Sequence, residues 1–339
     1  MSKEGMPVLW IIIPCYNEEK VLPVTAPLFL EKLQNLMNRG RIDRQSRILF
    51  IDDGSGDRTW ELIRNYSEKN SSYAGISLSR NRGHQNALLA GLLSAINHCD
   101  ITISMDCDGQ DDIHAIDEMI QEYQKGAEIV YGVRSDRSTD TRFKRMSAQL
   151  YYKLLNYMGV ETIYNHADFR LVSAKVLKQF NNYQEVNLYL RGLFPLVGYK
   201  KSVVYYKRNS RLAGQTHYPL KKMIALGVEG ITSLSIKPLR MLFGAGFCLF
   251  TISLLLLVIT IVSGMRTGTI DQLKSILFTI CCMGGFQLIS IGILGEYIGK
   301  TYLETKHRPR FIVAEKTGFH EKEKNERGSE YEWSFPEEE

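Results

Sequence analysis

The first 210 residues alternate short apolar runs with stretches of helical periodicity. The apolar runs have the length of buried strands and occupy residues 8–13, 47–51, 74–78 and 101–105. Helical stretches such as residues 85–96 lie between them. This alternation predicts a mostly parallel sheet covered by helices. Because ligands bind such sheets beyond the carboxyl ends of the strands, we expect the chemistry in the loops that follow these runs.

Acidic residues follow three of the expected strands. They stand in residues 14–19 (PCYNEE), 52–55 (DDGS) and 106–110 (DCDGQ). Carboxylates crowded at one edge of a sheet repel one another unless a cation or a donor-rich ligand compensates them. Asp106 and Asp108, separated by one residue, suit a hard divalent cation that also holds substrate phosphates. Oxygen ligands of this kind favour Mg²⁺ or Mn²⁺ over zinc.

Charge and cysteine usage narrow the class of protein. The net charge is +5, but the stretch from Glu315 onward carries nine acidic and four basic residues, so residues 1–314 hold about +10. A basic body suits nucleic acid, anionic lipid or a phosphorylated substrate. The six cysteines form no CxxC pair, which argues for a reducing compartment and against a disulfide framework or zinc site.

Two long stretches in the second half lack charged side chains. They cover residues 241–265 and 275–294, each long enough to cross a bilayer as a helix. Basic residues cluster on the outer flanks, whereas the link holds only Arg266 and Lys274. This bias predicts a transmembrane hairpin with both flanks in the cytosol. An amphipathic helix should precede it, so we expect a multi-pass protein of the bacterial plasma membrane with a cytosolic catalytic domain.

The acidic motifs resemble the signatures of family 2 glycosyltransferases with the GT-A fold. Residues 80–84 (RNRGH), 167–171 (ADFRL) and 211–214 (RLAG) are similar to those of the polyprenyl-phosphate glycosyltransferases. That group contains dolichol-phosphate mannose synthase and bacterial bactoprenol glucosyltransferases. The resemblance runs from about residue 7 to 310. It implies an α/β, GT-A (Rossmann-like) nucleotide-sugar-binding domain, followed by an amphipathic interface helix and a two-helix transmembrane hairpin.

The expected domain limits follow from the resemblance and the hydropathy. We expect a cytosolic GT-A catalytic domain at residues 1–215 and a juxtamembrane amphipathic helix at residues 216–238. Two transmembrane helices should follow at residues 239–298, then a cytosolic return segment at residues 299–316 and a disordered acidic tail at residues 317–339.

The resemblance also implies roles for individual residues. The donor-binding residues would be Pro14, Tyr16, Glu18, Asp53, Asp106, Gln110 and Arg211. The metal, Mg²⁺ or Mn²⁺, would be held by Asp106, Asp108 and Gln110. The catalytic residues would be Asp168, Arg134, Arg145 and Arg170. Arg134 and Arg145 would grip the acceptor phosphate. Asp168 is interpreted first as an orienting or metal-supporting group and second as a general base.

Two positions depart from the family pattern. His84 and His217 stand where many relatives carry lysine. A histidine is largely neutral near pH 7 at its ordinary pKa, so the phosphate-contacting role of these positions is open.

The resulting hypothesis is an inverting enzyme of cell-envelope glycan modification. It would transfer a single sugar, glucose or N-acetylglucosamine, from a nucleotide-sugar (UDP favoured) to polyprenyl (undecaprenyl) phosphate at the cytosolic membrane face. Related enzymes suggest a homo-oligomer. The alternatives are a processive polysaccharide synthase and a non-catalytic membrane scaffold. The synthase usually needs a Gln-x-x-Arg-Trp element, yet the only tryptophan after Trp60 is Trp333. The clustered acids oppose nucleic-acid binding.

Overall fold

A computed structural model of the chain describes residues 5–135, 157–158, 166–183, 185, 189–208, 232, 235–267 and 272–319. Arg145, Arg211 and His217 lie outside the described residues, and so does most of the amphipathic helix expected at residues 216–238.

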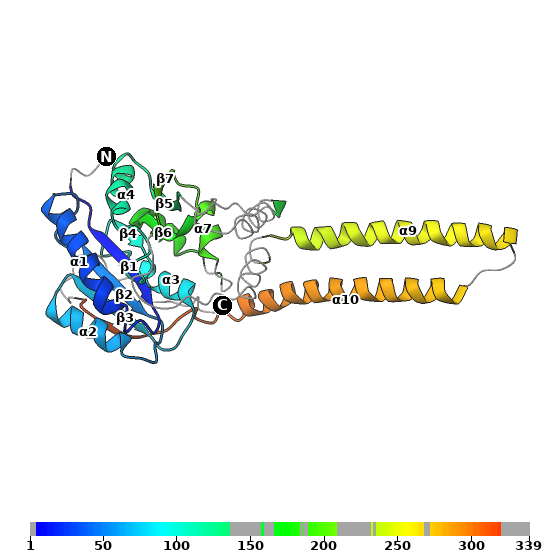
Figure 1. The fold of residues 1–339 in the computed structure, drawn as a ribbon, viewed down its shortest axis with the longest axis horizontal. Helices are drawn as coiled ribbons and strands as arrows, with labels where there is room; N and C mark the ends of the chain where they lie inside the picture. Colours follow the sequence, from blue (N-terminus) through cyan, green and yellow to red (C-terminus); the bar gives the residue numbers. More distant parts are fainter. Residues whose placement is uncertain are drawn as a thin grey trace, which may run out of the picture.

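The described residues form one eight-stranded mixed sheet, ordered β7-β5-β6-β4-β1-β2-β3-β8 (Figure 1). Its strands are β1 Leu9–Cys15, β2 Arg47–Asp52, β3 Tyr73–Leu78, β4 Ile101–Ser104, β5 Ile129–Arg134, β6 His166–Ser173, β7 Lys201–Tyr206 and β8 Val313–Thr317. Strands β4, β1, β2 and β3 run parallel, as the sequence predicted. Strand β6 runs antiparallel to both β4 and β5, and β7 is parallel to β5. The parallel strands therefore end together at one edge of the sheet, here called the carboxyl edge.

Helices cover both faces of this sheet. One face packs against α1 Leu22–Asn38, α2 Thr59–Lys69 and α4 Ala115–Gln124. The other packs against α3 His84–Ala95, α6 Ala174–Phe180 and α7 Leu190–Leu196.

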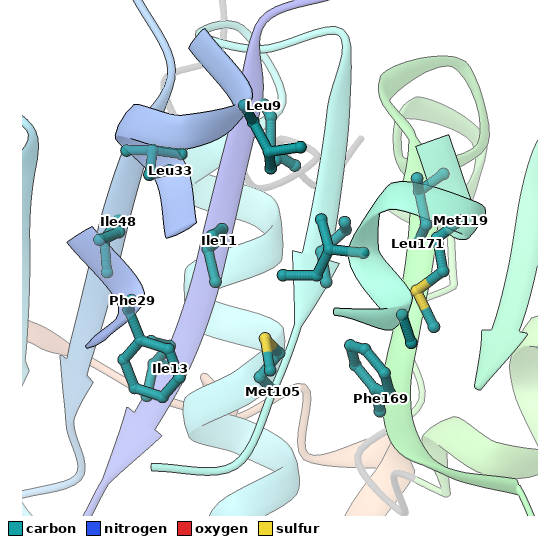
Figure 2. Close-up of a cluster of buried hydrophobic side chains, with 14 of the residues drawn as sticks. Leu9, Ile11, Ile13, Phe29, Leu33, Ile48, Met105, Met119, Phe169 and Leu171 are labelled. Atoms are coloured by element: carbon teal, nitrogen blue, oxygen red, sulfur yellow. The ribbon is translucent and has the colours of Figure 1, made fainter. Parts of the chain in front are cut away.

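Strand β1 supplies apolar side chains to both faces. Leu9, Ile11 and Ile13 enter the core beside Phe29 of α1, as Figure 2 shows. Trp10 and Ile12 enter the opposite core. A strand buried on both faces reads as an unbroken apolar run, which explains why the sequence identified it.

The end of the described chain returns to the sheet. Strand β8 pairs antiparallel with β3 at the edge of the sheet. The Trp60 indole N–H donates to Glu315 Oε2 at 3.0 Å, and Arg47 Nη1 donates to the carbonyl oxygen of Gly318 at 2.6 Å. The Phe319 ring packs 5.7 Å from that of Trp10. This C-terminal segment, residues 310–319, therefore belongs to the sheet domain, although the sequence predicted no strand there.

Two long helices form a hairpin that extends away from the sheet domain (Figure 1). They are α9 Lys237–Thr267 and α10 Gln272–Thr305, and they lie side by side. Large apolar side chains of the hairpin are exposed, including Phe243 at 79% and Leu288 at 73%.

The membrane assignment from the sequence needs correction. Within the part of the chain that the structure describes, no helix is long and apolar enough to cross a membrane. Charged side chains lie towards one end of each run in which every side chain is described: Lys237 and Arg240 in residues 235–249, and Glu296, Lys300 and Glu304 in residues 283–305. The helical hairpin is confirmed, but its two transmembrane helices are not supported. The multi-pass location in a bacterial plasma membrane is contradicted.

The pairing of β8 predicts that the catalytic sheet needs its C-terminal segment. A chain ending at residue 309 loses the β8 ladder and the apolar contacts of Phe319. We expect this to cost about 2 kcal/mol or more, which corresponds to a fall of about 4–8 °C in Tm. A chain ending at residue 319 keeps these contacts and is the matched control. Thermal unfolding of both chains checks the prediction, and equal Tm values would contradict it.

Candidate functional site

Three loops interlock at the carboxyl edge. The loop after β1 and the loop after β2 exchange hydrogen bonds: the Asn17 N–H donates to Ser55 Oγ and the Gly56 N–H donates to Asn17 Oδ1, both at 2.9 Å. Asn17 adopts a positive φ of 55°, a conformation that asparagine tolerates better than most residues. The two loops therefore share one rigid frame.

Asp53 ties the loop after β3 into this frame. It is 2% exposed, and its carboxylate accepts the N–H groups of Arg82 at 2.7 Å and Gly83 at 2.9 Å. Burial raises the pKa of Asp53, and these two N–H groups offset only part of that rise. Gly54, at φ +65°, lies so close that a Cβ would stand 2.4 Å from the Arg80 carbonyl carbon. Asp53, predicted to bind the donor, thus holds the backbone that leads to His84.

The loop after β4, residues 106–110, carries the expected metal ligands. The Asp106 side chain is 33% exposed, and its Oδ1 lies 3.7 Å from His84 Nε2. Asp108 is 9% exposed, and its Oδ1 accepts the Gln110 N–H at 3.1 Å. Arg208, two residues beyond β7, donates to Gln110 Oε1. The loop therefore presents carboxylate and amide oxygens beside cationic side chains.

Asp168 lies at the centre of a cationic cluster. Its Oδ1 accepts Arg170 Nη2 at 2.8 Å, and its Oδ2 accepts Arg191 Nη2 at 3.0 Å and lies 3.4 Å from His84 Nε2. Burial alone would raise the pKa of Asp168. The charge of Arg191, the hydrogen bond of His84 and the charge of Arg170 instead hold it well below its usual range. A carboxylate held in this way stays ionised and is a poor proton acceptor.

The same contacts charge His84. Partial desolvation lowers its pKa, but the hydrogen bond to Asp168 and the negative charges of Asp106 and Asp168 raise the pKa from 6.5 to about 9. His84 therefore carries a positive charge at neutral pH. The neutral state expected from the sequence is wrong at this position, because its carboxylate neighbours come from distant strands.

A second polar group lies behind the 106–110 loop. Asp111 is 2% exposed; its Oδ1 accepts the Tyr206 hydroxyl at 2.6 Å and its Oδ2 accepts the Asp106 N–H at 3.3 Å. Arg134, at the end of β5, donates its Nε–H to Tyr206 Oη at 3.4 Å. Burial and the charge of Asp111 raise the pKa of Tyr206, so its hydroxyl keeps the proton that it donates.

The structure brings most of the expected residues to this edge. His84 lies between Asp106 and Asp168. Arg208 contacts Gln110, in the same loop as Asp106 and Asp108. Tyr206 contacts both Arg134 and Asp111. Tyr16, directly after β1, is 49% exposed, whereas Pro14 within β1 is buried. The Glu18 N–H donates to Thr59 Oγ1 at 2.8 Å.

The contacts of Arg170 differ from those expected of a catalytic residue. Its side chain is fully buried, pairs with Asp168 and lies 4.6 Å from the centre of the Phe194 ring. It has no exposed surface with which to contact a substrate, so its observed contacts are those of a residue that positions Asp168.

Four contributors were missed by sequence reasoning: Asp111, Arg191, Tyr206 and Arg208. None stands in the motifs that the resemblance used, although Asp111 directly follows Gln110. That adjacency was the one available signal. The others reach the site only through folding, from α7 and from the end of β7.

Comparison with known proteins decides the family. The profile described as "Glycosyl transferase family 2" matches residues 10–180. A Bacillus subtilis protein, the uncharacterized glycosyltransferase YkoT, is 45% identical over 311 residues, which cover 92% of each chain. The chain belongs to glycosyl transferase family 2. The α/β, GT-A (Rossmann-like) fold expected from the sequence is thereby confirmed.

Other relatives in the family carry more specific names. A bactoprenol glucosyl transferase of Shigella phage SfV is 38% identical over 308 residues, covering 89% of this chain and 97% of the relative. A solved structure of glucosyl-3-phosphoglycerate synthase from Mycobacterium tuberculosis, in complex with Mn²⁺, UDP-glucose and phosphoglyceric acid, is 16% identical. The match covers 67% of this chain and 78% of that chain with a TM-score of 0.42.

The close approach at Gly54 predicts a strong effect of a single methyl group. Gly54→Ala places a Cβ against the Arg80–Asn81 backbone at a positive φ, and we expect a loss of about 2–4 kcal/mol in the free energy of unfolding. Gly56→Ala is the control, because a Cβ there meets nothing within 4 Å. Urea unfolding measures both variants. Equal losses would show that the loops do not interlock as described.

The charge state of His84 can be measured by NMR titration of the metal-free protein. We expect a pKa of about 9, which Asp168→Asn should lower because it removes a neighbouring negative charge. The stabilisation from this contact is full below pH 6.5 and is lost as the pH rises through about 9.

Asp117→Asn is the control for this titration, since Asp117 pairs with Lys32 on α1. It should leave the pKa of His84 unchanged. A wild-type pKa near 6.5, or no response to Asp168→Asn, would contradict the proposed contact.

Proposed function

We propose that this enzyme transfers a single sugar from a nucleotide-sugar to the phosphate of a polyprenyl lipid. The observation that carries the proposal is the 106–110 loop at the carboxyl edge, where the Asp106 carboxylate lies 3.7 Å from His84 and the Gln110 amide oxygen accepts from Arg208. Such an edge suits a donor diphosphate, because it offers both cation ligands and direct positive charge. The names of the bactoprenol relatives support a polyprenyl phosphate acceptor and favour glucose over N-acetylglucosamine.

A divalent cation fits the residues at this edge. Among the described residues, no three His, Cys, Asp or Glu side chains are grouped to hold a metal ion. Mg²⁺ commonly binds through one or two carboxylates together with substrate phosphates, so Asp106 and Asp108 suffice when the donor supplies the remaining oxygens. We propose that Asp106, Asp108 and Gln110 hold Mg²⁺ or Mn²⁺. When bound, the cation would stabilise negative charge on the leaving diphosphate.

The donor pocket would use the interlocked loops. Tyr16, with its exposed ring, and Glu18 would line the base and ribose, with Pro14 beneath them. Asp53 would act indirectly by fixing the loop from Arg82 to His84. His84, positively charged at neutral pH, would take the phosphate-contacting role that lysine has in many relatives, and Arg211 would contribute a further charge.

The acceptor phosphate needs guidance more than activation. A phosphate monoester has a second pKa of about 6, so it is largely a dianion at neutral pH. Arg134, whose guanidinium fork matches phosphate geometry, would bring it to the donor together with Arg145. Asp168 accepts contacts from Arg170, Arg191 and His84 and would orient them, rather than remove a proton. Direct displacement with inversion follows, because the lipid phosphate attacks opposite the departing diphosphate.

The proposal predicts the product and its dependence on the 106–110 loop. Incubation with undecaprenyl phosphate, Mn²⁺ and a panel of UDP-sugars should give a lipid heavier by one sugar, read by mass spectrometry. Asp106→Asn and Asp108→Asn should each lower turnover by about 100-fold or more. Each change weakens binding of the cation that would stabilise the negative charge developing on the leaving diphosphate.

Asp112→Asn is the matched control, with the same change of charge two residues beyond Gln110, and it should retain activity. A ladder of sugars on one lipid would favour a processive synthase. The absence of product with every nucleotide-sugar would favour a non-catalytic scaffold.

A further inference from the structure

The hydroxyl of Tyr206 connects Arg134 at the end of β5 with Asp111, directly after the 106–110 loop. Tyr206 ends β7 and is 3% exposed. Its hydroxyl donates to Asp111 Oδ1 at 2.6 Å and accepts the Nε–H of Arg134 at 3.4 Å. A phenol has one proton to donate and lone pairs to accept, so both contacts are compatible at once.

Asp111 passes this connection on to the 106–110 loop. Its second oxygen, Oδ2, accepts the backbone N–H of Asp106 at 3.3 Å. Asp111 is 2% exposed and therefore has little surface with which to meet a substrate. The contacts run without a break from Arg134 through Tyr206 and Asp111 to Asp106.

Tyr206 also contacts the chain next to Arg134 and next to Asp168. Its carbonyl oxygen accepts the N–H of Ser135 at 2.9 Å and the Ser135 hydroxyl at 3.0 Å, directly after Arg134. Its ring meets Phe169 edge-on, with the ring centres 5.1 Å apart, next to Asp168. The phenol position is therefore set by β5, β6 and β7 together.

We propose that Tyr206 and Asp111 are positioning residues that hold Arg134 and the 106–110 loop at a fixed separation. This inference rests on the proposed function, in which Arg134 meets the acceptor phosphate and the loop meets the donor. Transfer between two anionic substrates depends on their relative placement, so a small displacement of either side costs rate. A buried polar pair could also serve stability alone, and the test has to separate these two roles.

The test uses the full-length protein and the variant Tyr206→Phe. It removes the hydroxyl but keeps the ring that packs on Phe169. We expect kcat/KM for undecaprenyl phosphate to fall by about 10- to 100-fold, the range for residues that orient a site from behind. KM for both the lipid phosphate and the UDP-sugar should rise. A variant that merely lowers the amount of folded enzyme would reduce kcat and leave both KM values unchanged.

Two further variants complete the design. Tyr205→Phe is the matched control. The Tyr205 side chain, next to Tyr206 in the sequence, is 67% exposed, so this variant should behave as the wild type. Arg134→Gln combined with Tyr206→Phe should lose less than the product of the two single losses, because the second change breaks a connection already cut.

The outcomes separate the two hypotheses. If neither wild type nor Tyr205→Phe transfers sugar, the proposed function fails. If both transfer sugar and Tyr206→Phe is as active as they are, the positioning role is overturned while the function stands. The same holds if Tyr206→Phe loses activity with unchanged KM values and the loss in the double variant with Arg134→Gln equals the product of the two single losses.

Discussion

The repulsion among carboxylates at one edge of the sheet is the constraint on which the site depends. Asp53 and Asp111 are each 2% exposed, and Asp168 is 9% exposed. Each is compensated differently: Asp53 by backbone N–H groups, Asp111 by a phenol, and Asp168 by two arginines and a histidine. Buried charges that lacked such partners would be strongly destabilising, so these contacts hold the loops in place as they neutralise the acids.

These contacts also distinguish the compensated acids from Asp106. Asp53, Asp111 and Asp168 already hold backbone, phenol and cationic groups, whereas Asp106 keeps a third of its side chain exposed beside His84. The contacts of the fixed acids hold the loops in the frame, and Asp106 of the 106–110 loop lies partly exposed beside it. The same frame explains why His84 is charged at neutral pH, since two carboxylates from different strands converge on it. In the proposed reaction, this geometry lets two phosphate-bearing substrates approach each other.

Local patterns and tertiary contacts explain what the sequence could and could not predict. Strand β1 was readable because both of its faces are buried, and the acids that follow β4 stand in a recognisable motif. Strand β8, an edge strand with Glu315 and Lys316, has no such apolar signal. Arg191 meets Asp168 across 23 residues, and Tyr206 meets Asp111 across 95, so no local spacing announces either contact.

The most direct test is a crystal structure with Mn²⁺ and UDP, with the metal located by its anomalous scattering. The account predicts one strong peak in contact with carboxylate oxygens of Asp106 and Asp108 and with the UDP diphosphate, while Asp53, Asp111 and Asp168 keep their present partners. A diphosphate bound without metal at this loop, or a metal held instead by Asp53 or Asp168, would contradict it.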